Sequence, residues 1–284
     1  AIEFIGAQRG PWHLFVDIGM PHLPCRPSAP FSRMYDPAAI PEWPGWNDTF
    51  ENKPFAHEQQ AWNWNLEAMP WAEMAVQVAR YYGMVSQIDD AIGRILRHVD
   101  LRDTLVVFTS DHGDMCGNHR MLDKHCTLYQ DIVRVPLILA GPGVEAQVND
   151  NLVSNCLDLP VTLASLLGFA PPEGAHGQSL FGPARKTITS SGNGQQFGMF
   201  NSRMITDGHL KYVWNLTDID ELYDLDADKG ECRNIIRERY DSPALKALRA
   251  DLYADLKAHG DPFIRHGWLD GQLLGERKHK PWRE

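Results

Sequence analysis

The sequence predicts an α/β fold with a doubly wound, incomplete sheet, followed by a smaller α+β subdomain. Three observations support this prediction: strand-like and helix-like segments alternate over the first 170 residues, a polar loop follows each expected strand, and short β-like segments replace this pattern beyond Pro171. Each expected element is taken in chain order below.

Near the N-terminus, the apolar run of residues 12–18 (WHLFVDI) predicts a buried parallel strand. The Pro- and Gly-rich residues 19–30 then predict a loop that leaves the carboxyl end of that strand. Residues 41–71 hold five of the nine tryptophans without a sustained period, so we expect an ordered but irregular insertion there.

A long amphipathic helix is predicted next, because apolar residues recur at steps of three and four from Met74 to Val99. A buried strand is expected at residues 104–110 and another strand at 135–140, with a polar, His-rich segment between them. A short apolar helix over residues 157–167 should end at Gly168.

The second part of the chain is expected to be a separate, smaller subdomain. It carries β-like segments at residues 204–206, 211–214 and 222–225, and then helices from about 242 to 259. We therefore predict a catalytic-type α/β domain over residues 1–185 and an α+β subdomain over residues 186–284.

Composition excludes several classes of partner. The 284 residues include 27 Lys and Arg against 37 Asp and Glu, a net charge of −10, which argues against binding to nucleic acid or to anionic membranes. No apolar run approaches the roughly 20 residues that span a bilayer. The five cysteines are odd in number and form no C-x-x-C pair, so they describe no disulfide framework and leave the compartment open.

The most polar segment carries the candidate chemistry. Ser110-Asp111-His112-Gly113 stands where a strand should end, and an Asp followed by a His there can direct two ligand atoms at one divalent cation. The alternative for such a pair is an ordinary turn with a surface histidine. His119, Lys124 and His125 follow within a few residues, which favours a site.

These residues carry a family resemblance. The string FTSDHGDMCGNHRMLDKHCTLYQDIVRVPLIL (residues 108–139) resembles the signature of the sulfatase family, within the alkaline phosphatase superfamily. Further segments follow in the order of that family: PHLP at 21–24, YYGMVSQID at 81–89, LDLP at 157–160, GQSL at 177–180 and ELYDL at 221–225. The resemblance implies an alkaline-phosphatase-like sheet and a hydrolase of sulfate esters.

Roles follow from the resemblance residue by residue. Asp111 and His112 would bind one divalent metal, which the family implies to be Ca²⁺; because imidazole is a softer donor than oxygen, Mn²⁺ or Zn²⁺ is the alternative. Lys124 would contact the sulfate oxygens and His22 the bridging oxygen of the ester, both as catalytic and substrate-binding residues. His119 and His125 are weaker candidates for the substrate pocket, with a structural role as the alternative.

The nucleophile motif of the family has no full match. Sulfatases use a formylglycine made within C/S-x-P-x-R, whereas Cys25-Arg26-Pro27-Ser28-Ala29 has Ala29 in place of the essential Arg. The chain also begins Ala1-Ile2-Glu3-Phe4, without Met. We expect the formylglycine and the first metal-binding aspartates to lie in a missing N-terminal part, the chain alone to be inactive, and its partner to be that part or a second copy.

Three functions remain open at this stage. The first is hydrolysis of a small-molecule or carbohydrate sulfate ester. The second is hydrolysis of a phosphonate monoester or phosphodiester, since sulfate and phosphate esters differ mainly in charge. The third is a non-catalytic fragment that binds an anion or a partner. The Trp-rich insertion resembles the variable region that shapes substrate pockets in the family, although packing explains it equally well.

Overall fold

The computed structural model describes residues 1–124, 127–194, 198–265, 267–275 and 281–282. Helices are present at α1 (Ile2–Ala7), α2 (Phe55–Trp64), α3 (Trp71–Leu96), α4 (Gln130–Val133), α5 (Asn155–Leu166), α6 (Ile236–Arg239), α7 (Pro243–Ala258) and α8 (Gly267–Leu273). Strands are present at β1 (Val106–Thr109), β2 (Leu137–Ala140), β3 (Ile188–Asn193), β4 (Asn201–Thr206), β5 (Leu210–Asn215) and β6 (Glu221–Asp224).

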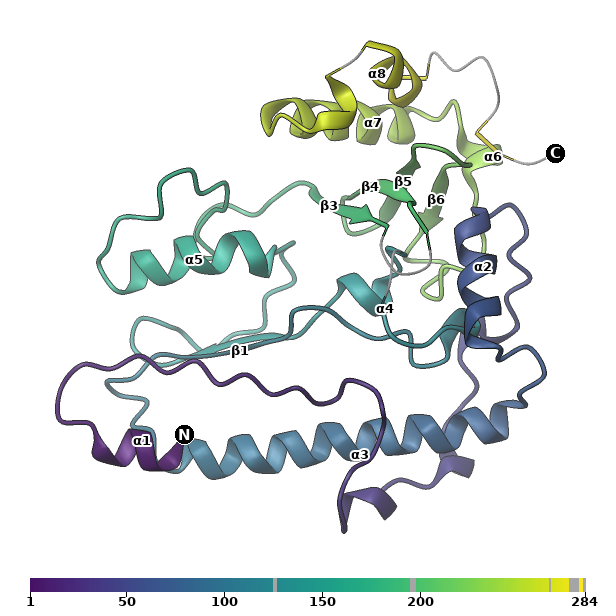
Figure 1. Ribbon diagram of the computed structural model, residues 1–284. Coiled ribbons are helices and arrows are strands. Elements are labelled where there is room, and N and C mark those ends of the chain that lie inside the picture. The colour runs from purple at the N-terminus through teal and green to yellow at the C-terminus, as the bar shows by residue number, and fades with distance from the viewer. Residues whose placement is uncertain (125–126, 195–197, 266, 276–280, 283–284) are drawn as a thin grey trace.

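The first part of the chain is layered as an α/β protein. Figure 1 shows α3 below the β1–β2 pair and α5 above it. The two strands pair antiparallel, with Val106 opposite Ala140 and Thr109 opposite Leu137. This arrangement confirms the predicted α/β class, although the pairing of β1 with β2 is antiparallel rather than parallel.

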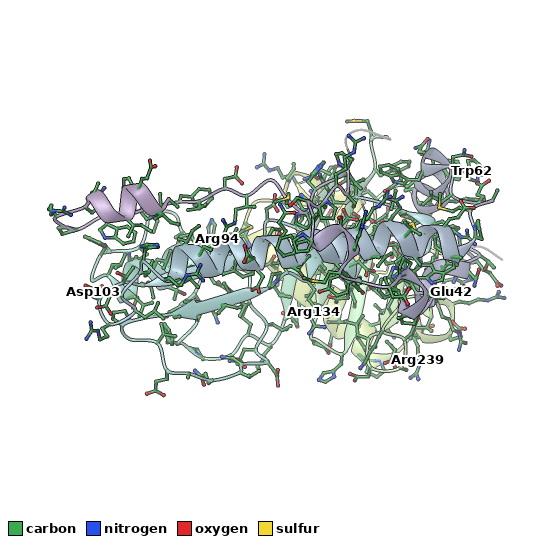
Figure 2. All side chains as sticks on the ribbon, turned by 90° about the horizontal axis from the view of Figure 1, so that it is seen from below. Glu42, Trp62, Arg94, Asp103, Arg134 and Arg239 are labelled. Atoms are coloured by element: carbon green, nitrogen blue, oxygen red, sulfur yellow. The ribbon has the colours of Figure 1, made fainter. Side chains whose placement is uncertain are left out.

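Helix α3 forms where the apolar periodicity predicts it. It begins after Pro70 and buries Met74, Val78, Met84 and Ile88 along one face. Seen from below in Figure 2, it runs much of the length of the molecule, with Asp103 near one end and Trp62 near the other. The helical turns at Phe31–Arg33 and Pro37–Ala39, which follow PHLP, pack against this helix.

The second part of the chain is a four-stranded antiparallel sheet in the order β3-β4-β5-β6, covered on one face by α7. Because side chains alternate along a strand, the two faces of this sheet differ. Tyr212 and Leu222 face the leucines of α7 in an apolar core, whereas Lys211 and Tyr223, which are paired across β5 and β6, lie on the opposite face. That second face meets the first part of the chain.

One predicted strand is absent, and the predicted burial of another is wrong. Residues 12–18 form no strand, and Phe15 in that run is 81% exposed. A strand exists only where a neighbour accepts its backbone hydrogen bonds, and no other described segment pairs with these residues. Strand β1 forms as predicted but is not buried, since its residues are half-buried or exposed, with Phe108 at 36%.

The Trp-rich insertion is more regular than its composition predicts. Helix α2 begins after Pro54 and ends at Asn65, whose left-handed φ of 51° suits a helix terminus. Trp46 is buried and packs edge-to-face on Trp71, close to Met74 and Val78 of α3. The tryptophans of this small core therefore serve packing.

The predicted boundary at 185/186 falls just before β3 begins at Ile188 and stays a prediction. Among the described residues, no helix has the length and apolar character needed to cross a membrane. The four described cysteines, Cys25, Cys116, Cys156 and Cys232, are free thiols.

Candidate active site

The carboxyl end of β1 opens into the Asp111–His112 pair. The His112 N–H donates to Asp111 Oδ1 at 2.9 Å, and the Ser110 hydroxyl donates to the carbonyl of His112 at 2.8 Å. Burial acts to raise the pKa of Asp111, but the hydrogen bond from His112 and the other local donors outweigh it, so this pKa lies below its ordinary value. Asp111 is therefore an anion whose side chain is 83% exposed toward the cleft.

The tautomer of His112 follows from its neighbours. Its Nδ1 lies 2.8 Å from the carbonyl of Gly113, which can only accept, so Nδ1 carries a hydrogen. The other ring atom, Nε2, lies 3.4 Å from Asp111 Oδ2. Nε2 and a carboxylate oxygen thus face one another, and both are atom types that can bind one cation.

Gly113 lets the chain turn away at this point. A Cβ on this residue would lie 1.9 Å from the carbonyl oxygen of Asp131, and the Gly113 N–H donates to the carbonyl of Ile132 at 2.8 Å. Only glycine allows so close an approach of two backbone segments. The turn after the metal-type pair is therefore fixed by contact with the end of the polar segment.

Lys124 and His22 meet in space although 102 residues separate them. Lys124 Nζ lies 2.8 Å from His22 Nε2 and 2.8 Å from Asp123 Oδ1. His22 Nδ1 lies 2.8 Å from the carbonyl of Leu23, so Nδ1 carries a hydrogen and Nε2 accepts from the ammonium. The two interactions use two of the three ammonium hydrogens.

His22, Lys124, Asp111 and His112 all line one cleft of about 1720 Å³. The structure thus brings together the four residues that carry the predicted catalytic and metal roles. Asn155 also lines this cleft, and its amide donates to the carbonyl of Ser110 at 2.7 Å. Sequence reasoning missed Asn155; its place at the start of the helix predicted over residues 157–167 was the available signal.

The two weaker histidines differ from this group. His125 lies outside the described residues. His119 is fully buried and does not line the cleft, so the structure does not place it in the pocket wall. Its Nδ1 lies 2.6 Å from Asp48 Oδ2, and its ring stacks on Tyr129 with centroids 4.0 Å apart. The tryptophans of the insertion are likewise absent from the cleft lining.

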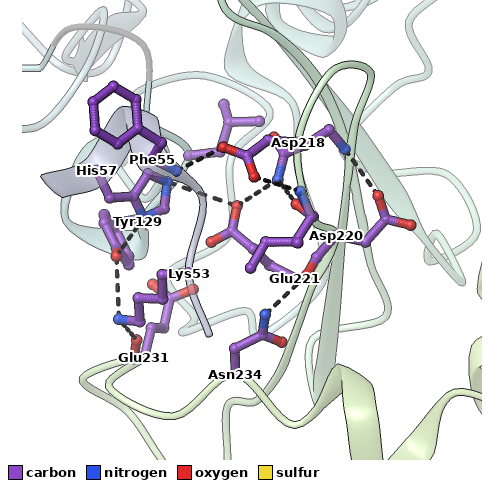
Figure 3. Close-up of polar contacts among 12 residues, drawn as sticks. Lys53, Phe55, His57, Tyr129, Asp218, Asp220, Glu221, Glu231 and Asn234 are labelled. Atoms are coloured by element: carbon purple, nitrogen blue, oxygen red, sulfur yellow. Dashed lines mark hydrogen bonds and ion pairs between the residues drawn. The ribbon is translucent and has the colours of Figure 1, made fainter. Parts of the chain in front are cut away.

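Figure 3 shows a network of buried charged and polar residues that sequence reasoning missed. Lys53 Nζ donates to the Tyr129 hydroxyl at 3.2 Å, which in turn lies 2.8 Å from His57 Nδ1. The His57 Nε2 lies 3.6 Å from Glu221. Burial lowers the pKa of His57 to about 4, which keeps this ring neutral at ordinary pH.

A second chain of contacts extends the network to the C-terminal sheet. Lys211 pairs with Glu231, and Glu231 Oε2 accepts from the backbone N–H of Gln130 at 2.6 Å. The Tyr223 hydroxyl donates to Glu221 at 2.5 Å. The available sequence signal was the ELYDL segment together with Glu231. Glu221, Tyr223 and Glu231 from these segments are buried in the structure.

A metal would find only part of its ligand set here. Among the described residues, no group of three or more His, Cys, Asp or Glu side chains converges as a metal site. Asp111 and His112 supply two donors, one hard and one borderline, whereas protein metals take four or more ligands. The pair fits a divalent cation as a partial ligand set.

Cys25 lacks the properties of an activated thiol. Burial raises its pKa to about 11, so the thiolate is disfavoured. This agrees with the absence of the motif arginine at Ala29.

The fold and the cleft together define an α/β protein of alkaline-phosphatase-like architecture, with charged and imidazole groups along one cleft. Residues 1–169 match the family model described as Sulfatase, and the chain belongs to the sulfatase family.

Three relatives illustrate the match. The chain is 32% identical over 231 residues to the Delta 4,5-hexuronate-2-O-sulfatase of Bacteroides thetaiotaomicron, covering 73% of this chain and 48% of the relative. A solved structure of a 2-O GAG sulfatase aligns with 100% of this chain and 62% of its own, at 25% identity and a TM-score of 0.64. The phosphonate monoester hydrolase of Agrobacterium radiobacter aligns over 96% of this chain and 59% of its own, at 24% identity and a TM-score of 0.70.

These comparisons set the reach of the assignment. The chain spans about half the length of that curated relative. The match to the phosphonate monoester hydrolase, below 25% identity, establishes the shared fold. The sulfatase family implies a divalent metal.

Proposed function

We propose that the protein hydrolyses sulfate esters in the cleft lined by His22, Asp111, His112 and Lys124. The observation that carries the proposal is that an ammonium, an imidazole and a carboxylate–imidazole pair, from segments far apart in the sequence, all line one cleft. A tetrahedral anion needs positive charge and hydrogen-bond donors in a fixed arrangement, and these groups supply them.

Each residue has a role that its geometry allows. The Lys124 ammonium is held by Asp123 and His22, and it would stabilise negative charge on the sulfate oxygens. His22 keeps its Nδ1 hydrogen on the carbonyl of Leu23, so Nε2 is the atom that would face the leaving oxygen. To deliver a proton from Nε2 the ring would have to be doubly protonated, in place of the neutral form that accepts from Lys124.

Asp111 and His112 would hold the divalent cation through a carboxylate oxygen and Nε2. The bound cation supplies neutralisation of charge on the sulfate group. We propose Ca²⁺ from the family, with Mn²⁺ as the alternative that an imidazole ligand favours.

The nucleophile is a separate requirement. No full C/S-x-P-x-R motif occurs within the 284 residues. The proposal therefore concerns the protein together with whatever supplies its formylglycine.

The substrate class that we propose is a sulfated carbohydrate. The support is the similarity to a hexuronate-2-O-sulfatase, at 32% identity over 73% of this chain. Small sulfate esters such as an aryl sulfate are the simpler alternative within the same chemistry.

The test measures turnover by the protein expressed from its native gene. Substrates are an unsaturated hexuronate 2-O-sulfate disaccharide, p-nitrophenyl sulfate and a phenyl phosphonate monoester. We expect hydrolysis of the sulfates, and Lys124→Ala should lower kcat/KM by about 10²-fold or more, as loss of a charged stabilising group does. Lys246→Ala is the matched control, because Lys246 is an exposed lysine paired with Asp241 and does not line the cleft.

Two results would contradict the proposal. Preference for the phosphonate over both sulfates would assign the protein to phosphonate hydrolysis. Binding of sulfate without any turnover would support the non-catalytic alternative.

A further inference from the structure

We propose that His119 and Asp48 are positioning residues for Lys124: their buried contact fixes a left-handed turn whose exit aims the ammonium at His22 and the anion. This inference rests on the proposed function in that Lys124 is taken as the anion contact. Neither residue lines the cleft, so both would act through the turn rather than by touching substrate.

The turn that leads to Lys124 has an unusual backbone. Cys116, His119, Arg120 and Asp123 all have positive φ, at 46°, 50°, 57° and 64°. Residues with a Cβ avoid this region, so such a conformation persists only where the surroundings hold it. Four such residues within eight positions mean that the path into Lys124 is imposed by tertiary contacts.

Contacts from outside the turn hold it at each position. The Asn118 side chain accepts from the Gly45 N–H at 3.0 Å, and its amide donates to Asp131 at 2.9 Å. The Arg120 guanidinium donates to the carbonyls of Trp46, Leu66 and Met69 at 2.7 to 2.9 Å. Segments far away in sequence thus hold both neighbours of His119.

His119 is the most enclosed residue of the turn. Its ring lies nearly parallel to the ring of Tyr129, at an interplanar angle of 10°. Gly45 also packs against it, so closely that a Cβ on Gly45 would lie 2.8 Å from Cε1 of His119. Nδ1 donates to Asp48, while the buried Nε2 has no hydrogen-bond partner among the described residues. One hydrogen bond therefore fixes the ring.

Asp48 is itself held as an anion. Burial acts to raise its pKa, but the hydrogen bond from His119 and the charge of Lys53 lower it to about 2. Lys53 pairs with the same oxygen and also donates to the carbonyl of Glu231 at 2.6 Å. The carboxylate thus links the turn to the buried network and to the C-terminal subdomain.

Asp123 and Lys124, the residues at the end of the turn, line the cleft. The Asp123 N–H donates to Asp114 Oδ1 at 3.1 Å, and the Asp123 carboxylate holds Lys124 Nζ at 2.8 Å. Because Lys124 follows Asp123 without an intervening residue, a change in φ at Asp123 redirects the ammonium. Loosening the turn should therefore weaken anion contact before it unfolds the protein.

The experiment compares two amides at position 119. In His119→Asn the amide nitrogen can take the place of Nδ1 and donate to Asp48, whereas in His119→Gln it reaches the place of Nε2. Gly45→Ala is a third variant, whose Cβ would press on the Asn118 side chain at 2.5 Å and on the His119 ring at 2.8 Å. Leu252→Ala in α7 is a control that lowers Tm without touching the turn.

Three quantities are measured on the protein expressed from its native gene: Tm, the Kd for inorganic sulfate, and kcat with KM for the sulfate ester. We expect His119→Gln and Gly45→Ala to weaken sulfate binding and lower kcat by about tenfold relative to Leu252→Ala at equal Tm loss. His119→Asn should restore both to within about threefold, because the hydrogen bond to Asp48 is kept.

The outcomes separate the two proposals. Equal sulfate affinity and kcat in all variants of equal Tm would overturn the positioning role, and so would a wild-type protein that binds no sulfate. A wild-type protein that binds sulfate through Lys124, with the predicted order of variants, but turns over no ester would retain the positioning role and overturn the proposed function.

Discussion

Single hydrogen bonds decide which atoms of the cleft histidines are available. His22 and His112 each direct Nδ1 at the carbonyl of the next residue, Leu23 and Gly113 respectively, at 2.8 Å. Each therefore presents Nε2 to its functional neighbour, Lys124 for His22 and Asp111 for His112. The same local geometry underlies both roles that we propose, proton transfer by His22 and metal binding by His112.

At this scale Gly113 is a position where a side chain has no room. Gly113→Ala should lower the free energy of unfolding by about 1–3 kcal/mol, because the new Cβ meets the backbone of Asp131, which cannot move aside as a side chain could. Gly93→Ala is the matched control: nothing lies within 4 Å of its Cβ, and alanine in the interior of α3 should stabilise by about 0.5–1 kcal/mol. Thermal unfolding of both variants checks the sign, and a stable Gly113→Ala would contradict the close approach.

At the scale of elements, helix stability comes from local signals and one buried face. Helix α7 begins at Pro243, and its N-cap Ser242 accepts a hydrogen bond from the Leu245 N–H at 3.3 Å. Its buried leucines, spaced by three and four residues from Leu245 to Leu256, cover β4 and β5. The cap determines where the helix begins, and the leucine spacing determines which face of the helix packs on the sheet.

Removing the cap tests this account. Ser242→Ala should lower the free energy of unfolding by about 1 kcal/mol, since the Leu245 N–H loses its acceptor. Ser242→Asp keeps an acceptor oxygen and places negative charge at the helix N-terminus, so it should match the wild type within about 0.5 kcal/mol. Chemical denaturation measures both values, and equal loss in the two variants would show that the cap does not contribute.

At the scale of the whole molecule, the buried charged network joins the two parts of the chain. It includes Lys53 and His57 from the insertion, and Tyr129 from the segment just before α4. Glu221 and Glu231 join it from the C-terminal part of the chain. Apolar contacts are non-directional and tolerate small shifts between these segments, whereas a buried charge is destabilising unless it meets its partner. The C-terminal sheet thus contacts the segment that follows Lys124, through the Lys211–Leu128 and Glu231–Gln130 hydrogen bonds.

The network also predicts a pH dependence of stability. The pKa of His57 falls from 6.5 to about 4 on folding, because burial disfavours the charged ring. Between these values the unfolded chain binds more protons than the folded one, so stability should fall by up to about 3 kcal/mol as pH drops from 6.5 to 4.

Denaturation curves across this pH range measure the effect. His57→Gln should flatten the slope, since the substituted side chain does not titrate. His209→Gln is the control, because the hydrogen bond to Asp226 raises the pKa of this exposed histidine, so its small effect has the opposite sign. An unchanged slope in His57→Gln would show that the ring is not held neutral.

Local patterns account for what could be predicted. The helix around Val78, the strands beside the polar segment and the α7 leucines were predicted to within a few residues, because periodicity and turn residues act over short distances. Residues 12–18 carried the pattern of a strand but lack a partner, and α2 was missed because its Trp- and Asn-rich composition masks helical spacing. Pairing and packing are non-local, so composition alone could not supply them.

The sequence by itself determined the family, the α/β class and the four residues of the cleft, because short motifs fix both local geometry and chemical type. Only the tertiary structure decided that His22 Nε2 meets Lys124 Nζ, that His119 is buried against Asp48 rather than exposed in the pocket, and that two lysines lie inside the network. The physical reason is that a side chain's environment depends on segments far away along the chain, which local patterns do not encode.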